Sequence, residues 1–186
     1  DRMLVFGGYD GSFYNDVWAL SFAGATPAWS PVTPIGTPPS PRAGHVAVFD
    51  PDGDRMIVTS GYDGVTAPYN RVNDTWALSL SGTPEWTKIE AANPPVARSS
   101  ASAIYDSARR RLVLFGGTSP DFLADCWALP LDGAPDWVSV ASAGAIPARE
   151  EHSAVYDTAR DRMVVFGGYD TPTPNSHNFD DLWSLE

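Results

Sequence analysis

The sequence predicts an all-β protein built from short antiparallel strands in a repeat of about 50 residues. The segment DRMLVFGGYDG at residues 1–11 returns as DRMIVTSGYDG at 54–64, RRLVLFGGTSP at 110–120 and DRMVVFGGYDT at 161–171. Glycine and proline number 16 and 17 among 186 residues, which indicates frequent turns between short elements. No window shows the 3.6-residue hydrophobic period of a helix over a helical length.

Four columns of residues recur in register with this repeat. The glycine column is Gly8, Gly61, Gly117 and Gly168, with spacings of 53, 56 and 51 residues. One tryptophan column is Trp18, Trp76, Trp127 and Trp183, and a second is Trp29, Trp86 and Trp137. An arginine column is Arg42, Arg98 and Arg149. Four columns in step over three periods indicate a true structural repeat.

Each period holds four strand-like runs. In the second repeat these are roughly residues 45–50, 55–60, 75–80 and 85–89, which are rich in β-branched and aromatic residues and bounded by turn formers. DPDGD at 50–54 is a tight-turn sequence, so we expect the first two runs to form a hairpin. YDTARD occupies the same place at 156–161.

The pattern resembles the kelch repeat, in which a glycine pair closes the second strand and aromatic residues lie on the third and fourth. The resemblance covers the whole chain and implies a β-propeller, in which each repeat forms one four-stranded blade around a central channel. Ser60, in place of a first glycine, and tryptophan, in place of the usual third-strand tyrosine, are mild departures. Crowding near the axis explains the glycines, and flat contacts between blades explain the tryptophans.

With strands named a to d from the axis outward, the predicted blades span residues 1–34 (b to d), 42–90 and 98–141 (both a to d), and 149–186 (a to c). We therefore expect a single kelch segment over 1–186 with 14 strands, about three and a half blades, in an incomplete ring. Such a segment has open edges that favour association. We favour a fragment of a longer propeller that contacts the missing blades, with a homo-oligomer as the alternative.

Composition excludes several classes of partner. The formal net charge of −11 and the pI near 4.5 argue against nucleic acid, since a basic surface is lacking. No apolar run approaches the roughly 18 residues of a membrane span, so no membrane insertion is expected. The composition does not decide the cellular compartment. The DRMVVFGG segment and the composition rich in alanine, proline and aspartate resemble those of uncharacterised bacterial kelch proteins. That resemblance suggests a bacterial, extracytoplasmic or secreted protein.

The arginine column supplies the first candidate site. Among kelch domains that recruit ubiquitin-ligase substrates, the loops before each strand a and the loops after the glycines share one face, and arginines there grip acidic peptides. Arg42, Arg98 and Arg149 match those arginines, and guanidinium groups bind carboxylates in a bidentate way. Alternatively, each arginine pairs with an aspartate or a backbone carbonyl of its own or the next blade. A residue that recurs at the same position of successive blades can equally well stabilise the fold.

Tyrosine–aspartate pairs after the glycines supply the second candidate site. These ligand-binding candidates are Tyr9, Asp10, Tyr62, Asp63, Tyr169 and Asp170. Tyrosine offers a stiff contact area and a hydroxyl, which suits recognition. The alternative is a turn-forming aspartate beside a packing tyrosine. The third blade has Thr118 and Ser119 instead, so any such site is asymmetric.

The remaining reactive side chains favour structural roles. His45 and His152 share a repeat position where the third blade has Ala101, and Cys126 occupies an ordinary strand position beside a tryptophan. His177 lies in the loop TPTPNSHNFDD, where one histidine and two carboxylates are weak evidence for a metal. We therefore predict no catalytic residue, no metal site and no cofactor.

These observations favour a non-catalytic scaffold whose loops around the channel recognise a protein or peptide. A glycan-binding module, or a purely structural propeller unit of a larger bacterial surface protein, is the alternative. A part of a metal-dependent kelch enzyme, completed by missing blades, ranks last. The two histidines and two tyrosines of the copper radical oxidases and the Glu–Asp–His set of the iron-dependent specifier proteins have no counterpart that we find here.

Overall fold

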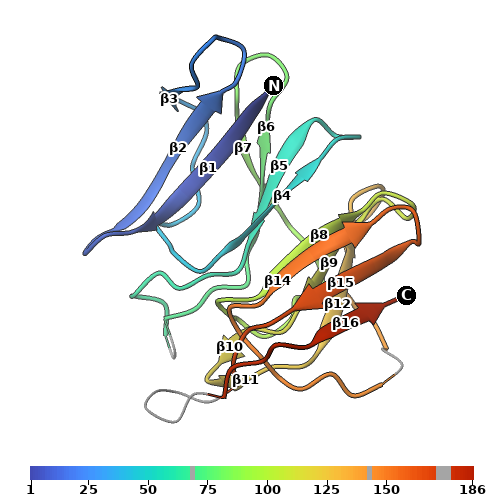
Figure 1. Ribbon diagram of the computed structural model, residues 1–186. Coiled ribbons are helices and arrows are strands. Elements are labelled where there is room, and N and C mark those ends of the chain that lie inside the picture. Colours follow the sequence, from blue (N-terminus) through green and yellow to red (C-terminus); the bar gives the residue numbers. More distant parts are fainter. Residues whose placement is uncertain (68–69, 142–143, 171–176) are drawn as a thin grey trace.

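A computed structural model describes residues 1–67, 70–141, 144–170 and 177–186, and it shows four antiparallel sheets that follow one another in chain order (Figure 1). Blade 1 contains β1 (Arg2–Tyr9), β2 (Phe13–Ser21) and β3 (Ala28–Val32). Blade 2 contains β4 (Val46–Asp50), β5 (Arg55–Thr59), β6 (Thr75–Ser79) and β7 (Trp86–Ile89). Blade 3 contains β8 (Ser102–Asp106), β9 (Arg111–Phe115), β12 (Cys126–Pro130) and β13 (Val138–Ser139). Blade 4 contains β14 (Ser153–Asp157), β15 (Arg162–Phe166) and β16 (Leu182–Leu185).

The predicted fold class and the 14 blade strands are confirmed. Each sheet has its strands in chain order, and the inner strands β4, β8 and β14 pack beside one another along the axis. A fifth, two-stranded ribbon, β10 (Thr118–Ser119) with β11 (Asp121–Phe122), was not predicted. It has the same place as the Tyr9–Phe13 pairing of blade 1, where the hairpin continues past the glycine pair with a shift of register between Phe6 and Gly8.

In blades 3 and 4 the second strand ends at a glycine pair whose second member has no room for a side chain. A Cβ on Gly117 would lie 2.6 Å from the carbonyl oxygen of Ser99, and one on Gly168 would lie 2.6 Å from that of Glu150. Both residues also have positive φ angles, of 90° and 88°. Close approach and backbone conformation together therefore require glycine at these positions.

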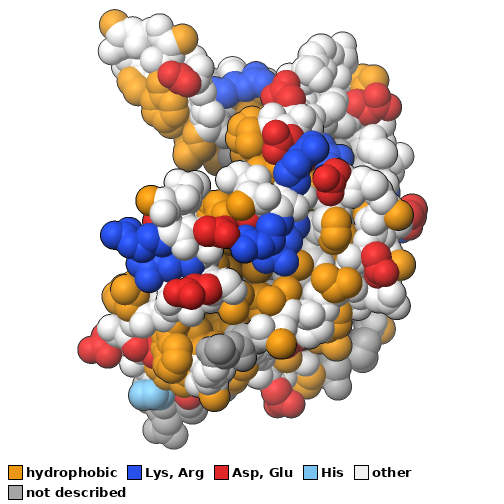
Figure 2. Space-filling model, turned by 90° about the vertical axis from the view of Figure 1, so that its right-hand side faces the viewer, with side chains coloured by type: hydrophobic (Ala, Val, Ile, Leu, Met, Phe, Trp, Pro, Cys, Tyr) orange, Lys and Arg blue, Asp and Glu red, His pale blue; other side chains and the backbone are white. Residues whose placement is uncertain are grey.

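An ion pair clamps the turn between the first two strands of each complete hairpin. Arg55 Nε donates to Asp50 Oδ2 at 2.7 Å, and the other Asp50 oxygen accepts from the backbone nitrogens of Asp52 and Gly53. Asp106 with Arg111, and Asp157 with Arg162, repeat the pair at 2.8 and 3.1 Å. This end of the molecule, at the right of Figure 1, carries interspersed basic and acidic side chains (Figure 2).

Tryptophans fill the space between neighbouring blades. Trp86 of β7 is 4% exposed and packs against Phe6 and Val17 of blade 1, while Trp137 is 2% exposed between blades 3 and 2. Trp29, the equivalent residue in blade 1, is 51% exposed, since its side of the sheet faces away from blade 2. The predicted role of the tryptophans as contacts between blades therefore holds where two described blades meet.

We expect Trp86→Ala to lower the free energy of unfolding by about 3–5 kcal/mol, because it leaves a cavity between two blades. Trp29→Ala should cost about 1 kcal/mol or less, because half of its side chain is already in solvent. Urea unfolding of both variants at low protein concentration measures the difference. Equal losses would mean that contacts between blades do not stabilise the fold.

Candidate functional site

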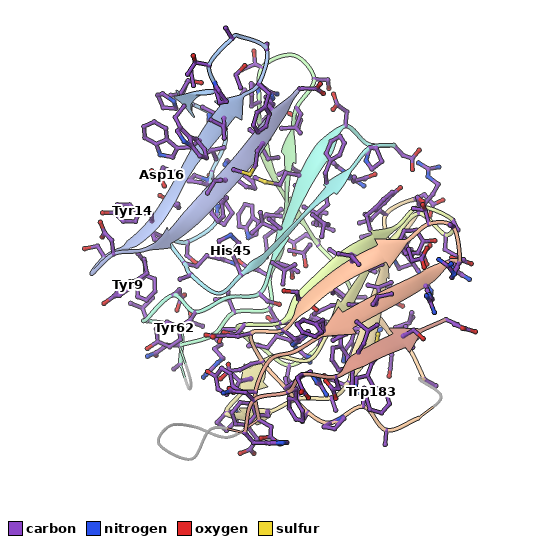
Figure 3. All side chains as sticks on the ribbon, viewed as in Figure 1. Tyr9, Tyr14, Asp16, His45, Tyr62 and Trp183 are labelled. Atoms are coloured by element: carbon purple, nitrogen blue, oxygen red, sulfur yellow. The ribbon has the colours of Figure 1, made fainter. Side chains whose placement is uncertain are left out.

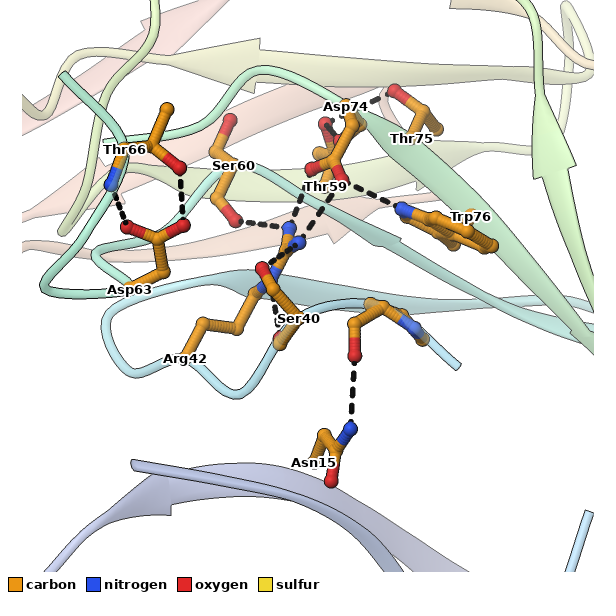
Figure 4. Close-up of polar contacts among 11 residues, drawn as sticks. Asn15, Ser40, Arg42, Thr59, Ser60, Asp63, Thr66, Asp74, Thr75 and Trp76 are labelled. Atoms are coloured by element: carbon orange, nitrogen blue, oxygen red, sulfur yellow. Dashed lines mark hydrogen bonds and ion pairs between the residues drawn. The ribbon is translucent and has the colours of Figure 1, made fainter. Parts of the chain in front are cut away.

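The arginine column forms a buried network inside each of blades 2, 3 and 4. Arg42 is 0% exposed, and its Nη1 and Nη2 donate to the two carboxylate oxygens of Asp74 at 2.6 and 3.0 Å (Figure 4). Nη1 also donates to the carbonyl of Ser60, and Nε and Nη2 donate to the carbonyl and hydroxyl of Ser40. The indole of Trp76 donates to the same Asp74 at 2.7 Å. All of the donors of Arg42 are engaged inside the protein.

The same network recurs in the next two blades. Arg98 binds Asp125 at 2.6 and 2.8 Å, and Arg149 binds Asp181 at 2.6 and 2.9 Å, with both arginines 0% exposed. The hydrogen bonds from Arg149 lower the pKa of Asp181 to about 2, so this carboxylate is charged at neutral pH. All three guanidinium groups are thus buried and paired inside their own blades, which agrees with the alternative expectation of a role in the architecture. Ligand binding by these arginines stays a prediction.

The tyrosine–aspartate pairs divide into exposed and packed members. Tyr9 is 61% exposed and touches Phe13 at 4.7 Å between ring centroids, and Asp10 beside it is exposed and accepts from the hydroxyl of Tyr14. Tyr62 is half-buried, with Phe13 at 5.5 Å, and Figure 3 shows it at the same end of the molecule as Tyr9.

Asp63 and Asp170 do not present free carboxylates to solvent. Asp63 is 6% exposed and accepts hydrogen bonds from the backbone nitrogens of Val65 and Thr66 and from the Thr66 hydroxyl (Figure 4). It forms a turn, which agrees with the alternative of a turn-forming aspartate, and a ligand contact by Asp63 stays a prediction. Asp170 lies 3.3 Å from Nδ1 of His177.

Tyr169 is held against its neighbours on both sides. Its ring meets Phe122 of blade 3 edge-on at 5.9 Å, and its backbone pairs with Glu150. Burial, then its hydrogen bond with Glu150, raises the pKa of Tyr169 to about 12. The hydroxyl therefore stays protonated at neutral pH and can act as a donor.

A groove of about 500 Å³ opens between the loops of blades 2, 3 and 4 at this end of the axis. Its lining includes Tyr62 and Arg71 from blade 2, Thr118 and Phe122 from blade 3, and Glu150 and Glu151 from blade 4. Of these, only Tyr62 belongs to the predicted ligand-binding residues. The rest were missed.

The groove floor is a chain of backbone hydrogen bonds across the blades. The amide of Ser100 donates to the carbonyl of Gly44, and the amide of Glu151 donates to that of Ser100. Ser100 and Glu151 have φ angles of 56° and 54° at the position that Gly44 occupies in blade 2. Side chains other than glycine with positive φ are uncommon, and such backbone conformations often occur at functional sites.

A sequence signal for part of the lining was present. Phe13, Arg71, Phe122 and Asn178 each lie five residues before the third-strand tryptophan. In every blade this residue pairs with the one that follows the glycine pair, as Arg71 does with Tyr62. The column varies from phenylalanine to arginine to asparagine, so a search for shared residue types does not detect it.

Comparison with known proteins decides the family. A family model described as the KLHDC2/KLHL20/DRC7 Kelch-repeats domain matches residues 1–147. The chain belongs to the kelch-repeat family.

This kelch chain spans only a small part of the length of the curated relatives that it matches. It is 33% identical over 181 residues to Multiple epidermal growth factor-like domains protein 8 of Rattus norvegicus, and 32% identical over 188 residues to Host cell factor 1 of Homo sapiens. Each alignment covers 90% of this chain but only 6% and 9% of those proteins. A solved structure titled "Structure of YjhT" matches with a TM-score of 0.65 at 16% identity, over 91% of this chain and 49% of that one. That likeness shows a shared fold.

Cys126 and His177 are two further side chains that could have chemical roles. Burial raises the pKa of the Cys126 thiol to about 11, so it is protonated at neutral pH. In the described ranges, no three His, Cys, Asp or Glu side chains come together in a way that could hold a metal ion. His177 is 64% exposed on the long loop, and residues 171–176 before it lie outside the described residues. Among the described residues no helix is long and apolar enough to cross a membrane.

His45 and His152 pack between neighbouring kelch blades, at the repeat position that the sequence assigns to structure. Their rings meet Phe6 and Phe115 edge-on, each at 5.1 Å. Burial first, and then the nearby Arg42 or Arg149, lowers the pKa of each imidazole to about 4. Both side chains are neutral in the folded protein at neutral pH.

The two histidines predict a dependence of stability on pH. An unfolded imidazole has a pKa near 6.5, so below that pH the unfolded chain binds more protons than the folded one. The contribution of the two neutral histidines to the free energy of unfolding should therefore be fully present above pH 6.5. The free energy of unfolding should then fall as the pH drops from about 6.5 to about 4. The double variant His45→Ala, His152→Ala, which copies Ala101 of blade 3, should flatten this slope in urea titrations. His177→Ala should leave the slope unchanged, and a wild-type slope in the double variant would contradict the assignment.

Proposed function

We propose that this chain is a non-catalytic binding module whose groove, between the loops of blades 2 to 4, receives an extended segment of a protein or peptide. Kelch-repeat domains are generally protein-binding scaffolds, which supports this class. The observation that carries the proposal is the groove itself. Its volume of about 500 Å³ is that of a ligand site, and it is lined by loops on a rigid frame.

Aromatic side chains give the groove its contact surface. Tyr62 of blade 2 and Phe122 of blade 3 line the groove. Each is half-buried by a ring of a neighbouring blade, Phe13 and Tyr169 respectively. Rings fixed in this way lose little conformational entropy when a ligand binds, so their contact area is available for affinity.

Charge favours a ligand with a cationic side chain. Glu150 and Glu151 line the groove, and the whole chain carries a formal charge of −11. The guanidinium of Arg71 lies 5.9 Å from the ring centroid of Tyr62, and its Nε donates to the hydroxyl of Ser99. With Arg42, Arg98 and Arg149 buried, the basis for expecting an acidic ligand is gone. The negative potential attracts a basic segment and should speed its association at low salt.

A selection from a random peptide library displayed on phage tests the proposal. Peptides enriched on the full chain should carry basic residues, and their dissociation constants should rise at least tenfold on Glu151→Gly or on Phe122→Ala. Glycine is the residue of blade 2 at the position of Glu151 and suits its positive φ, so this variant removes charge without strain.

The matched control is Tyr105→Phe at the opposite end of the blades, where Phe49 is the equivalent residue of blade 2. This variant should bind the selected peptides like the wild type. Peptides that bind all three variants equally, or no enrichment above an unrelated β-protein, would contradict the proposed function.

A further inference from the structure

A histidine lies at the junction between blades 3 and 4, next to the residues that line the groove. His152 is 7% exposed, and its ring meets Phe115 of blade 3 edge-on at 5.1 Å. A Cβ on Gly116 of blade 3 would lie 2.9 Å from Cε1 of this ring, and one on Gly168 of blade 4 would lie 2.9 Å from the Cβ of His152. The side chain therefore fills the space between the glycine pairs of the two blades.

The same contact recurs between blades 1 and 2 but not between blades 2 and 3. His45 of blade 2 meets Phe6 of blade 1 edge-on at 5.1 Å, and Figure 3 shows His45 between the two sheets. At the middle junction the residues equivalent to the phenylalanine, the first glycine and the histidine are all small: Thr59, Ser60 and Ala101. The chain thus contains two junctions with a packed imidazole and one matched junction without it.

A proton on His152 has no acceptor in the folded protein. Neither ring nitrogen has a hydrogen-bond partner among the described residues. The guanidinium of Arg149, itself 0% exposed, opposes a second positive charge beside it. The two nearest buried ion pairs already use their carboxylates, since Asp181 binds Arg149, and Asp125, whose carbonyl accepts from Gly116, binds Arg98.

Four more titratable side chains belong to the segments packed at this junction, and none of them bonds to the imidazole. Glu150 is hydrogen-bonded with Tyr169, and the exposed Glu151 lines the groove. Cys126 lies opposite Phe115 in the sheet of blade 3 and is a neutral thiol. A charged imidazole would therefore be buried without compensation, which is costly, and burial followed by Arg149 lowers the pKa of His152 to about 4.

Backbone hydrogen bonds cross each junction at the same place. The amide of Gly117 donates to the carbonyl of Arg149 at 2.9 Å, and the amide of Arg149 donates to the carbonyl of Leu123 at 3.1 Å. The equivalent bond between blades 2 and 3 runs from the amide of Gly61 to the carbonyl of Arg98 at 2.8 Å. Groove residues lie on both sides of the junction that holds His152: Thr118 and Phe122 from blade 3, and Glu150 and Glu151 from blade 4.

We propose that His152 is an acid-sensitive latch, which opens the junction between blades 3 and 4 when it takes up a proton and so separates two walls of the groove. Opening exposes the imidazole to water, where its pKa is near 6.5, so the open form gains protons as the pH falls from about 6.5 to about 4. Between pH 7 and pH 5 the equilibrium constant for opening should rise about tenfold or more. A ligand that contacts both walls is then released in acid. This consequence rests on the proposed function, whereas the latch itself does not.

Hydrogen exchange of the free protein at pH 7 and pH 5 tests the latch. The protection factor of the Gly117 amide, corrected for the intrinsic exchange rate, should fall about tenfold or more. That of the Gly61 amide, at the junction that has Ala101, should change by less than about threefold. Equal falls at the two amides would overturn the proposal, and this comparison needs only the wild-type protein. In His152→Ala the pH dependence at Gly117 should disappear, and its persistence would contradict the latch.

Release of a ligand is measured separately, with the basic peptides selected on the full chain. Between pH 7 and pH 5, their dissociation rate should rise about tenfold more from the wild type than from His152→Ala. Both proteins keep Glu150 and Glu151, so protonation of these carboxylates acts equally on the two. The same acceleration in both would exclude release through the latch. If no peptide binds, the proposed function fails, while hydrogen exchange still decides whether His152 opens the junction.

Discussion

In three of the four blades, an arginine that precedes the innermost strand reaches the aspartate that precedes the third strand. The Arg42–Asp74 pair is bidentate, and the same arginine binds the carbonyl of Ser60 at the end of the second strand, while the aspartate accepts from the indole of Trp76. One buried guanidinium thus fixes three segments that are up to 32 residues apart. Removing one partner of such a pair leaves a buried charge, which costs much more than an exposed pair contributes.

The position of the loops follows from this network. Hydrogen bonds to the buried guanidinium fix the ends of two sets of loops, those after the glycine pairs and those before the inner strands. The residues farther out in these loops differ from blade to blade. Tyr62, Phe122 and Glu151 line the groove for this reason, each one to five residues beyond a position that the repeat requires. The frame is repeated and the groove is not, which suits recognition of one asymmetric ligand.

The sequence predicted the fold well because each blade obeys the same local rules. Periodic strands, tight turns and columns of glycine and tryptophan depend on residues that are close together in the sequence. The 14 blade strands could therefore be assigned from the sequence alone. The site was predicted poorly, because a column such as Arg42, Arg98 and Arg149 marks what all blades share. Burial and pairing of Asp63 depend on contacts that the column does not show, and the groove residue Arg71 occupies a column of mixed residue types.

Urea unfolding of Asp74→Asn beside Asp16→Asn tests the central role of the buried pair most directly. Both aspartates accept from the indole of a third-strand tryptophan, but Asp16 is exposed and carries only that bond among the described contacts, whereas Asp74 neutralises the buried Arg42. We predict a loss of at least about 2 kcal/mol for Asp74→Asn and about 0.5 kcal/mol or less for Asp16→Asn. Equal losses from the two substitutions would contradict the account.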